Sequence, residues 1–351
     1  MQVPQMAAES LVNDSVDWSL AISTATRIAP SGPVLSRQQT QAAVDMLRDL
    51  ALEAVEPVQQ VTGLAAPPTS RAQVVDRATW IESNVAGMQI ALASLSETIY
   101  EGGLPAGVRS LGARGSAVQL GLVLGWLSGK VLGQYEVFTA PGQPGRLLLV
   151  APTIVQVEQQ LQVPSRDFRL WVCLHEETHR VQFGAVSWLG GYLASLVNEF
   201  IEASDLSFNE TLRRVTAVLG SIARRTSLME AAQSPEQREV FNKMTGVMSL
   251  LEGHADVVMD AVGPQVVPSV ALIRERFTER RNSPKAIDAV ARRALGMDLK
   301  LRQYTEGAAF VRQVVEAVGM TGFNQVWTSP QTLPTRTEIT NPDVWIKRMA
   351  G

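Results

Sequence analysis

The sequence predicts a mainly α-helical fold that includes one small β-hairpin or short sheet. Apolar residues recur at helical spacing over long stretches, and one short region alternates as strands do. Gly and Pro residues separate the helical stretches. With 351 residues, 46% of them hydrophobic and 19% charged, the chain is long enough to bury a substantial core.

The first helical stretches follow an N-terminal lead-in. Residues 1–40 have no clear periodic pattern and are expected to be irregular or loosely packed. A helical pattern covers residues 41–55, and a second runs over residues 72–100 with its apolar side chains along one stripe. We expect residues 41–351 to form a single helical domain, with any subdomain break near residues 134–165.

Glycine occupies every fourth position in the most apolar long stretch, residues 117–133. The residues concerned are Gly121, Gly125, Gly129 and Gly133. On a helix they would lie nearly on one face, which lets another backbone approach closely. Lys130 interrupts the stretch, which is also shorter than the roughly 18 apolar residues of a membrane span. Close packing in a soluble helical core is therefore favoured over a role at a membrane surface.

The strand signal comes next in the chain. Residues 134–139 alternate and are rich in β-forming residues, a Pro- and Gly-containing turn follows, and residues 146–150 form a second short strand. From about residue 165 the pattern is helical again, with breaks expected near residues 190, 234, 263, 283 and 319. Residues 329–342 contain three prolines and are expected to be extended or looping.

Composition excludes several classes of protein. The net charge of −3 gives no broad basic field for a nucleic-acid partner. Cys173 is the single cysteine, so no internal disulfide can form. The first twenty residues have neither the basic start nor the apolar run of a secretory signal. We therefore expect a cytoplasmic protein without a transmembrane segment. The oligomeric state is not indicated.

Histidine is rare, and its distribution is informative. The chain has three histidines, of which His175 and His179 lie four residues apart in a stretch with apolar flanks. Positions i and i+4 share a helix face, so both imidazoles can bind one metal ion. Glu176 follows the first histidine, where it can act as general base toward a metal-bound water. The spacing predicts a zinc site that needs a third protein ligand.

Two residues compete for that third position. Glu252 and His254 lie in an apolar helical stretch, where charged groups are costly unless they pair or bind a metal. They point about 200° apart on a helix, so both cannot easily bind, and Glu252 is favoured. Asp256 shares a face with Glu252 and is expected to accept a hydrogen bond from a ligand histidine. If His254 is not a ligand, it lines the cleft and stabilises an oxyanion, or it is a core histidine.

Three further residues are weaker candidates. Tyr304, on an expected helix, could stabilise a tetrahedral oxyanion, but a tyrosine at the edge of the core is favoured. Cys173 is expected to be a buried, inert thiol. Arg180 can pair with Glu176 or Glu177, which would contribute little if the pair is exposed.

Three segments resemble a known family: residues 175–183, residues 251–260 and residues 300–307. They look like the actinobacterial zincin-like metallopeptidases and hydrolases, one branch of which is associated with biosynthesis of a deazaflavin coenzyme. The resemblance covers roughly residues 70–350 and implies a zincin-like, mostly helical fold with a metallopeptidase-type site. Gln182 and Ala185 stand where metzincins have Gly and His, whereas Glu252 and Asp256 look like the gluzincin arrangement.

The sequence thus predicts a zinc-dependent hydrolase, specifically a gluzincin-type metallopeptidase that cleaves peptide or amide bonds of a peptide or protein substrate. The edge of the predicted hairpin could bind the substrate backbone by β-augmentation, as it does in zincins. The alternative is a catalytically inactive metal-bearing assembly or interaction protein with the same fold. The intact pair of His175 and Glu176 favours the enzyme, because metal binding does not require Glu176.

Overall fold

The computed structural model confirms the mainly α-helical class. It describes residues 16–65, 71–93, 106–140, 143–203, 234–282 and 297–350. The chain divides into two compact units, each built from separated segments. Unit 1 comprises Met1–Val58, Ala65–Gly184 and Gly263–Ile273, and unit 2 comprises Gln59–Leu64, Ala185–Val262 and Arg274–Gly351.

Unit 1 contains a three-stranded sheet in the order β1-β3-β2. The predicted hairpin is confirmed, since β2 (Gly133–Glu136) and β3 (Arg146–Val150) pair antiparallel, with Glu136 opposite Arg146. Strand β1 (Gln73–Val75) pairs parallel to β3 and lies where a helix was expected. Three residues are too few to show alternation, and the pairing partner of β1 is more than seventy residues away.

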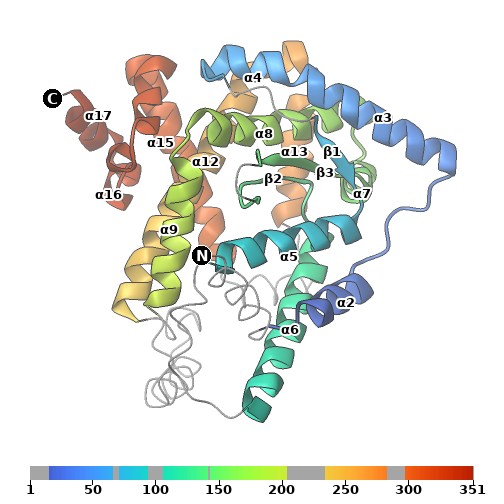
Figure 1. Ribbon diagram of the computed structural model, residues 1–351. Helices are drawn as coiled ribbons and strands as arrows, with labels where there is room; N and C mark the ends of the chain where they lie inside the picture. Colours follow the sequence, from blue (N-terminus) through green and yellow to red (C-terminus); the bar gives the residue numbers. More distant parts are fainter. Residues whose placement is uncertain are drawn as a thin grey trace. The chain divides into compact units, whose positions relative to one another are not determined.

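The sheet lies between α5 (Arg77–Ala93) and α8 (Ser165–Ala185), one helix on each side (Figure 1). Strand β3 is central, and its residues Leu147 to Val150 are all buried. A strand covered on both faces reads as a continuous apolar run, which explains the Leu-Leu-Leu-Val sequence. The sheet therefore gives α8 a rigid surface to pack on.

A close helix pair forms the lower part of unit 1 as drawn (Figure 1). Helix α2 (Trp18–Ile28), capped by Asp17, lies within the stretch expected to be irregular. It packs on α6 (Ala106–Ser128), where a Cβ on Gly121 or Gly125 would lie 2.7 Å from a carbonyl oxygen of α2. The expected close packing is confirmed for Gly121 and Gly125, whereas α6 ends before Gly129, and Gly133 lies in strand β2 and not on this helix. In the described part of the chain, no helix has the length and apolarity that crossing a membrane requires.

Two further helices of unit 1, α3 (Arg37–Glu53) and α7 (Ala151–Leu161), pack against strands of the sheet. Helix α3 starts at a capping box formed by Ser36 and Gln39, and α4 (Val55–Thr62) follows it. Helix α7 leaves the end of β3 and is linked to α8 by a buried ion pair between Glu158 and Arg169, 2.7 Å apart.

All of the described secondary-structure elements of unit 2 are helices. Its long helices are α9 (Leu189–Glu202), α12 (Pro235–Val266), α13 (Val270–Asn282) and α15 (Met297–Phe323), of which α12 ends and α13 begins in unit 1. Gly263 and Gly319 have φ of 69° and 73°, which are left-handed values that interrupt α12 and α15 at two expected breaks. The expected break near residue 283 lies outside the described residues.

The C-terminal part of unit 2 is more helical than its prolines suggest. Residues expected to be extended include η3 (Pro330–Thr332) and α16 (Arg336–Thr340), after η2 (Asn324–Trp327) and before α17 (Pro342–Ala350). Prolines start two of these helices, where the missing N–H costs nothing. Trp345 of α17 is buried, and its Nε1 donates to the Thr332 carbonyl at 2.8 Å.

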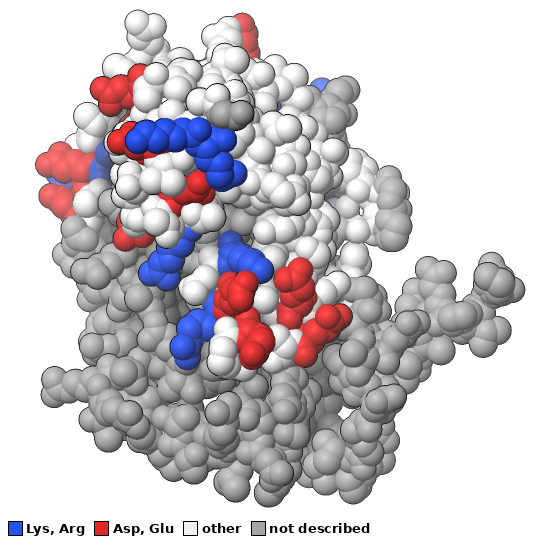
Figure 2. Space-filling view, turned by 90° about the vertical axis from the view of Figure 1, so that its left-hand side faces the viewer, with Lys and Arg blue, Asp and Glu red and all other residues white. Residues whose placement is uncertain are grey.

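Acidic and basic side chains lie next to one another over the described part of the face drawn in Figure 2. Neighbouring groups of opposite sign agree with the small net charge of −3. This face has no broad field of one sign in its described part.

Candidate metal centre

Helix α8 carries the predicted metal motif, and the local sequence explains where the helix begins. Pro164 precedes Ser165, the first helical residue, and the Pro164 carbonyl accepts the first helical hydrogen bond from Phe168. Asp167 places an acid in the first turn, which the helix dipole favours, and accepts two hydrogen bonds from Ser269. Phe168 is fully buried. The beginning of α8 is therefore held firmly in unit 1.

His175 and His179 face the same point one helical turn apart, as their spacing predicts. Their Nε2 atoms are 3.1 Å apart, and the half-buried rings meet edge-on with centroids 4.6 Å apart. Two imidazoles on a tetrahedral zinc ion would hold their nitrogens about 3.3 Å apart. The pair therefore fits zinc to within a few tenths of an ångström.

Glu176 lies against the first residue of strand β2. The carboxylate is 5% exposed, and a Cβ on Gly133 would lie 2.6 Å from Glu176 Cδ and 2.8 Å from Oε1. Glycine therefore leaves the room that the carboxylate occupies. Among the described strands, β2 is at an edge of the sheet, so the predicted base lies against an edge strand.

Gln182 contacts the second histidine from behind. Its Oε1 is 2.9 Å from His179 Nδ1, and the side chain is fully buried. From its position in the motif, Gln182 argues only against the metzincin subclass, and this contact was not predicted. The signal was available, because positions i and i+3 are neighbours on a helix and His179 needs an acceptor for its second nitrogen.

Arg180 pairs with Glu177, one of the two partners left open by the sequence. Its Nε and Nη2 donate to the two carboxylate oxygens at 2.6 and 2.5 Å. The pair is buried, with side chains 10% and 2% exposed, and not the exposed pair of little consequence considered above. Burial raises the pKa of Glu177, and the bond to Arg180 opposes that rise.

An aromatic contact joins strand β2 to the end of α8. Tyr135 and Phe183 stack with ring centroids 5.9 Å apart and planes 18° apart. Phe183 lies one turn beyond His179, and burial raises the pKa of the Tyr135 phenol. Residues two positions apart on a strand face the same side of the sheet, so Gly133 and Tyr135 both face α8.

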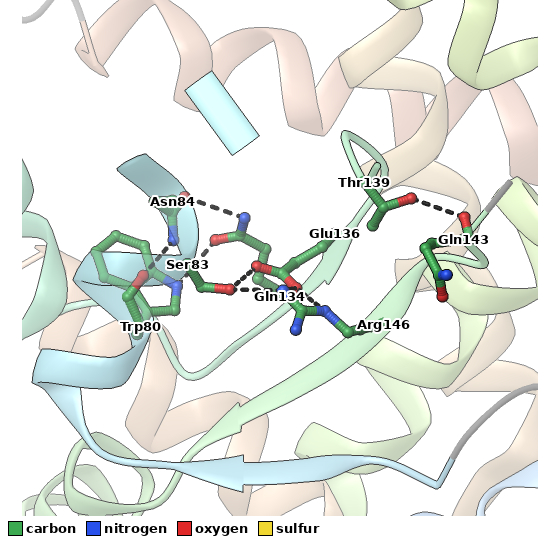
Figure 3. A network of polar contacts seen from close by, with 8 residues as sticks. All are labelled: Trp80, Ser83, Asn84, Gln134, Glu136, Thr139, Gln143 and Arg146. Carbon is green, nitrogen blue, oxygen red and sulfur yellow. Dashed lines mark hydrogen bonds and ion pairs between the residues drawn. The ribbon is translucent and has the colours of Figure 1, made fainter. Parts of the chain in front are cut away.

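The other side of strand β2 is fixed by a polar network (Figure 3). Its members on α5, β2 and β3 are Trp80, Ser83, Asn84, Gln134, Glu136 and Arg146. Trp80 Nε1 donates to Gln134 at 2.9 Å, and Arg146 Nε donates to Glu136 at 2.8 Å. These bonds hold β2 against α5, so Gly133 stays in place against Glu176.

The segment with the proposed third ligand lies where two helices of unit 2 cross closely. Gly253 of α12 meets Gly307 of α15, and a Cβ on Gly253 would lie 2.5 Å from the backbone nitrogen of Ala308. Gly307 in turn meets the backbone of Ser249. Two of the segments that resemble the zincin-like family therefore contact each other through glycine, and the crossing fixes the backbone beside Glu252.

His254 has the surroundings of a core residue. Its ring is fully buried and stacks on Phe323 with centroids 5.2 Å apart, and Trp327 lies 5.5 Å away. Of the alternatives for His254, namely metal ligand, oxyanion stabiliser or core histidine, this aromatic environment favours the last.

Asp256 binds two guanidinium groups, and not a ligand histidine as expected. Its oxygens lie 2.9 Å from Arg274 Nη1 and 2.6 Å from Arg312 Nη2, and Asp260 joins the same cluster. The cluster links α12 to α13 and α15. The prediction failed because a shared helix face with Glu252 does not say which arginines the fold brings to that face.

The other two weaker candidates, Cys173 and Tyr304, have different outcomes. Cys173 is completely buried, its Sγ lies 3.9 Å from the Leu47 carbonyl oxygen, and burial raises its pKa, so the expected burial is confirmed and the inertness of the thiol stays a prediction. Tyr304 lies on α15, but its side chain is outside the described part of the structure, so its role stays a prediction.

One carboxylate completes a possible ligand set. His175, His179 and Glu252, all half-buried, form a group in which one ligand atom of each lies within 4.8 Å of the others. Two imidazoles and a carboxylate are a usual donor set for catalytic zinc. Fold and donor set together are those of a helical protein that can hold a metal ion.

The chain belongs to the family of zincin-like metallopeptidases, whose model matches residues 16–346. It is also similar to the crystal structure of "a putative hydrolase with a novel fold" from Chloroflexus aurantiacus, at 31% identity and a TM-score of 0.69. That match covers 95% of this chain and 99% of the other. A comparison with curated proteins finds no significant match. Neither match bears on an actinobacterial branch or on deazaflavin coenzyme biosynthesis.

Proposed function

We propose that this protein is a zinc-dependent hydrolase that cleaves peptide or amide bonds, with Glu176 as general base. The observation that carries the proposal is the pair of imidazoles on α8, whose Nε2 atoms lie 3.1 Å apart. Family membership and the buried carboxylate of Glu176 beside that pair support it. Metal binding alone would not require Glu176, so its presence in the motif favours a catalytic role.

The proposed ligands are His175, His179 and Glu252. The carboxylate is supported by the 4.8 Å ligand group, whereas the aromatic packing of His254 argues for a role in the core. A glutamate as third ligand is the gluzincin pattern of donors.

Zinc and Glu176 would have different roles in the reaction. A bound zinc ion supplies Lewis-acid polarisation of the scissile carbonyl and acidifies a water molecule. Glu176 takes one proton from the attacking water as the C–O bond forms, and later gives it to the leaving nitrogen as the C–N bond breaks. The products are a carboxylic acid and an amine, so Glu176 ends as it began.

Strand β2 would bind the substrate. Its outer edge offers backbone N–H and C=O groups to an extended peptide, as in β-strand addition. Gly133 places that edge next to Glu176, and the network behind β2 prevents the strand from moving away. A substrate paired with this edge would present its backbone carbonyl beside the base.

Glu176→Gln tests the general base. The variant should bind zinc as the parent does, whereas hydrolysis in a peptide-library digest should fall by roughly 10²- to 10⁴-fold. Glu239→Gln, on an exposed glutamate of α12, is the matched control and should cut normally. Full activity of Glu176→Gln would refute the assignment. A zinc-loaded parent that cuts no peptide or amide would favour the inactive metal-bearing assembly or interaction protein.

Glu252→Ala tests the third ligand against His254→Phe. The first variant removes a proposed donor and should weaken zinc binding by 100-fold or more, measured by competition with a chromophoric chelator. The second keeps an aromatic ring among Phe323 and Trp327 and should change zinc binding little. The reverse ranking would make His254 the ligand.

A further inference from the structure

We infer that Gln182 is a positioning residue that holds His179 in the tautomer required for metal binding. The inference rests on the zinc-binding part of the proposed function and is independent of whether the protein hydrolyses anything. It assigns a role to a side chain that the motif His-Glu-x-x-His does not contain.

The hydrogen-bond chemistry at this contact has a definite direction. The Gln182 carboxamide oxygen can only accept, so His179 Nδ1, 2.9 Å away, must donate its hydrogen. A neutral imidazole carries one N–H, so the proton on Nδ1 leaves a lone pair on Nε2. That same Nε2 faces Nε2 of His175 at 3.1 Å. The contact therefore presents the metal-binding lone pair at the point where the two rings converge.

Burial makes the contact rigid. Gln182 is fully buried, its neighbour Val181 is also fully buried, and a buried amide is costly unless it is hydrogen-bonded. Both residues of the contact lie on one rigid helix, three positions apart, so the ring cannot turn without breaking the bond. A neutral acceptor also suits a helix that already buries the carboxylates of Glu176 and Glu177.

This arrangement replaces the one expected for Asp256. The Asp256 carboxylate binds Arg274 and Arg312. The hydrogen-bond partner of His179 is instead the side-chain amide of Gln182, which lies on α8 as His179 does. Loss of such an outer partner commonly costs 10- to 100-fold in metal affinity.

The test compares zinc affinities of three variants with the parent protein by chelator competition. Gln182→Leu keeps the size of the side chain and removes the acceptor, so zinc should bind 10- to 100-fold more weakly. Gln182→Glu keeps a hydrogen-bond acceptor at this position, so its zinc affinity should be within about threefold of that of the parent. Thr178→Val is the matched control, because it removes a buried polar group of α8 that bonds only to the Leu174 carbonyl among the contacts described.

A second measurement does not need zinc. The chain has three histidines, so ¹⁵N-detected NMR of the metal-free protein can assign each ring after single substitutions. His179 should carry its proton on Nδ1 in the parent and in Gln182→Glu. A parent with the proton on Nε2 of His179 would overturn the inference even if Gln182→Leu fails to fold.

The affinities separate this inference from the proposed function. Equal zinc affinity of Gln182→Leu and parent would overturn the inference, as would an equal loss in Gln182→Leu, Gln182→Glu and Thr178→Val. A parent that binds zinc but hydrolyses nothing would overturn the hydrolase proposal alone. A parent that binds no zinc would overturn both.

Discussion

Glu177 shows how a single residue of α8 links the stability of the protein to pH. Its carboxylate is 1% exposed and is bound by Arg180. Burial is the largest influence on it and raises its pKa, so ionising Glu177 is unfavourable in the folded protein. Stability from a raised carboxyl pKa is fully present below the unfolded value of about 4.5 and is lost as pH rises through the folded value.

Arg180→Met should therefore destabilise the protein in a pH-dependent way. Removal of one partner of a buried pair costs about 3–5 kcal/mol, because the remaining charge stays buried. The loss should be largest at neutral pH and should shrink toward pH 5, where Glu177 can take up a proton. Urea unfolding between pH 5 and 8 measures this.

Arg48→Met provides the comparison for that prediction. Arg48 pairs with Asp45 on the surface, with both side chains 54% exposed, so its loss should change stability by at most about 1 kcal/mol. If Arg180→Met costs no more than Arg48→Met, or costs the same at every pH, the buried pair does not act as described.

At the scale of elements, two helix crossings depend on glycine. Helix α6 packs on α2 through Gly121 and Gly125, and α12 packs on α15 through Gly253 and Gly307. In both crossings, a backbone atom of the partner helix lies within 2.7 Å of each Cβ position, and backbone cannot move aside as a flexible side chain can. The glycines therefore fix how closely the helices approach.

Gly125→Ala should destabilise the protein by about 1–3 kcal/mol, because the new Cβ would meet Ile28 and lie 2.7 Å from the Ala25 carbonyl oxygen. Gly115→Ala, on the same helix with nothing within 4 Å, should be neutral or stabilise by up to about 1 kcal/mol. Thermal unfolding of both variants checks the pair. Similar effects of the two substitutions would argue against close packing of α2 on α6.

At the scale of the whole molecule, zinc binding should contribute to stability. A ligand that binds only the folded state at 100 times its dissociation constant adds about 2.7 kcal/mol. Chelation of zinc should then lower the unfolding temperature by roughly 5 °C, seen by calorimetry, and added zinc should restore it. His175→Ala should show no response to the chelator. An identical response of His175→Ala and parent would place the stabilising ion elsewhere.

The fold could be predicted from the sequence wherever the pattern is local. The periodicity of α3, α5 and α8, the hairpin of β2 and β3, and the breaks at Gly263 and Gly319 all come from residues close in sequence. Strand β1 and helix α2 were missed, because each is stabilised by a distant partner. For β1 that partner is β3, and for α2 it is the glycine face of α6.

The sequence by itself determined the helical class and the geometry of His175 and His179, because a period of 3.6 residues puts i and i+4 on one face. Only the tertiary structure decided the neighbours of that pair: Gly133 against Glu176, and arginines on Asp256. Such contacts depend on which faces pack together. Spacing along the chain fixes local geometry, whereas burial and long-range packing choose the partners of each side chain.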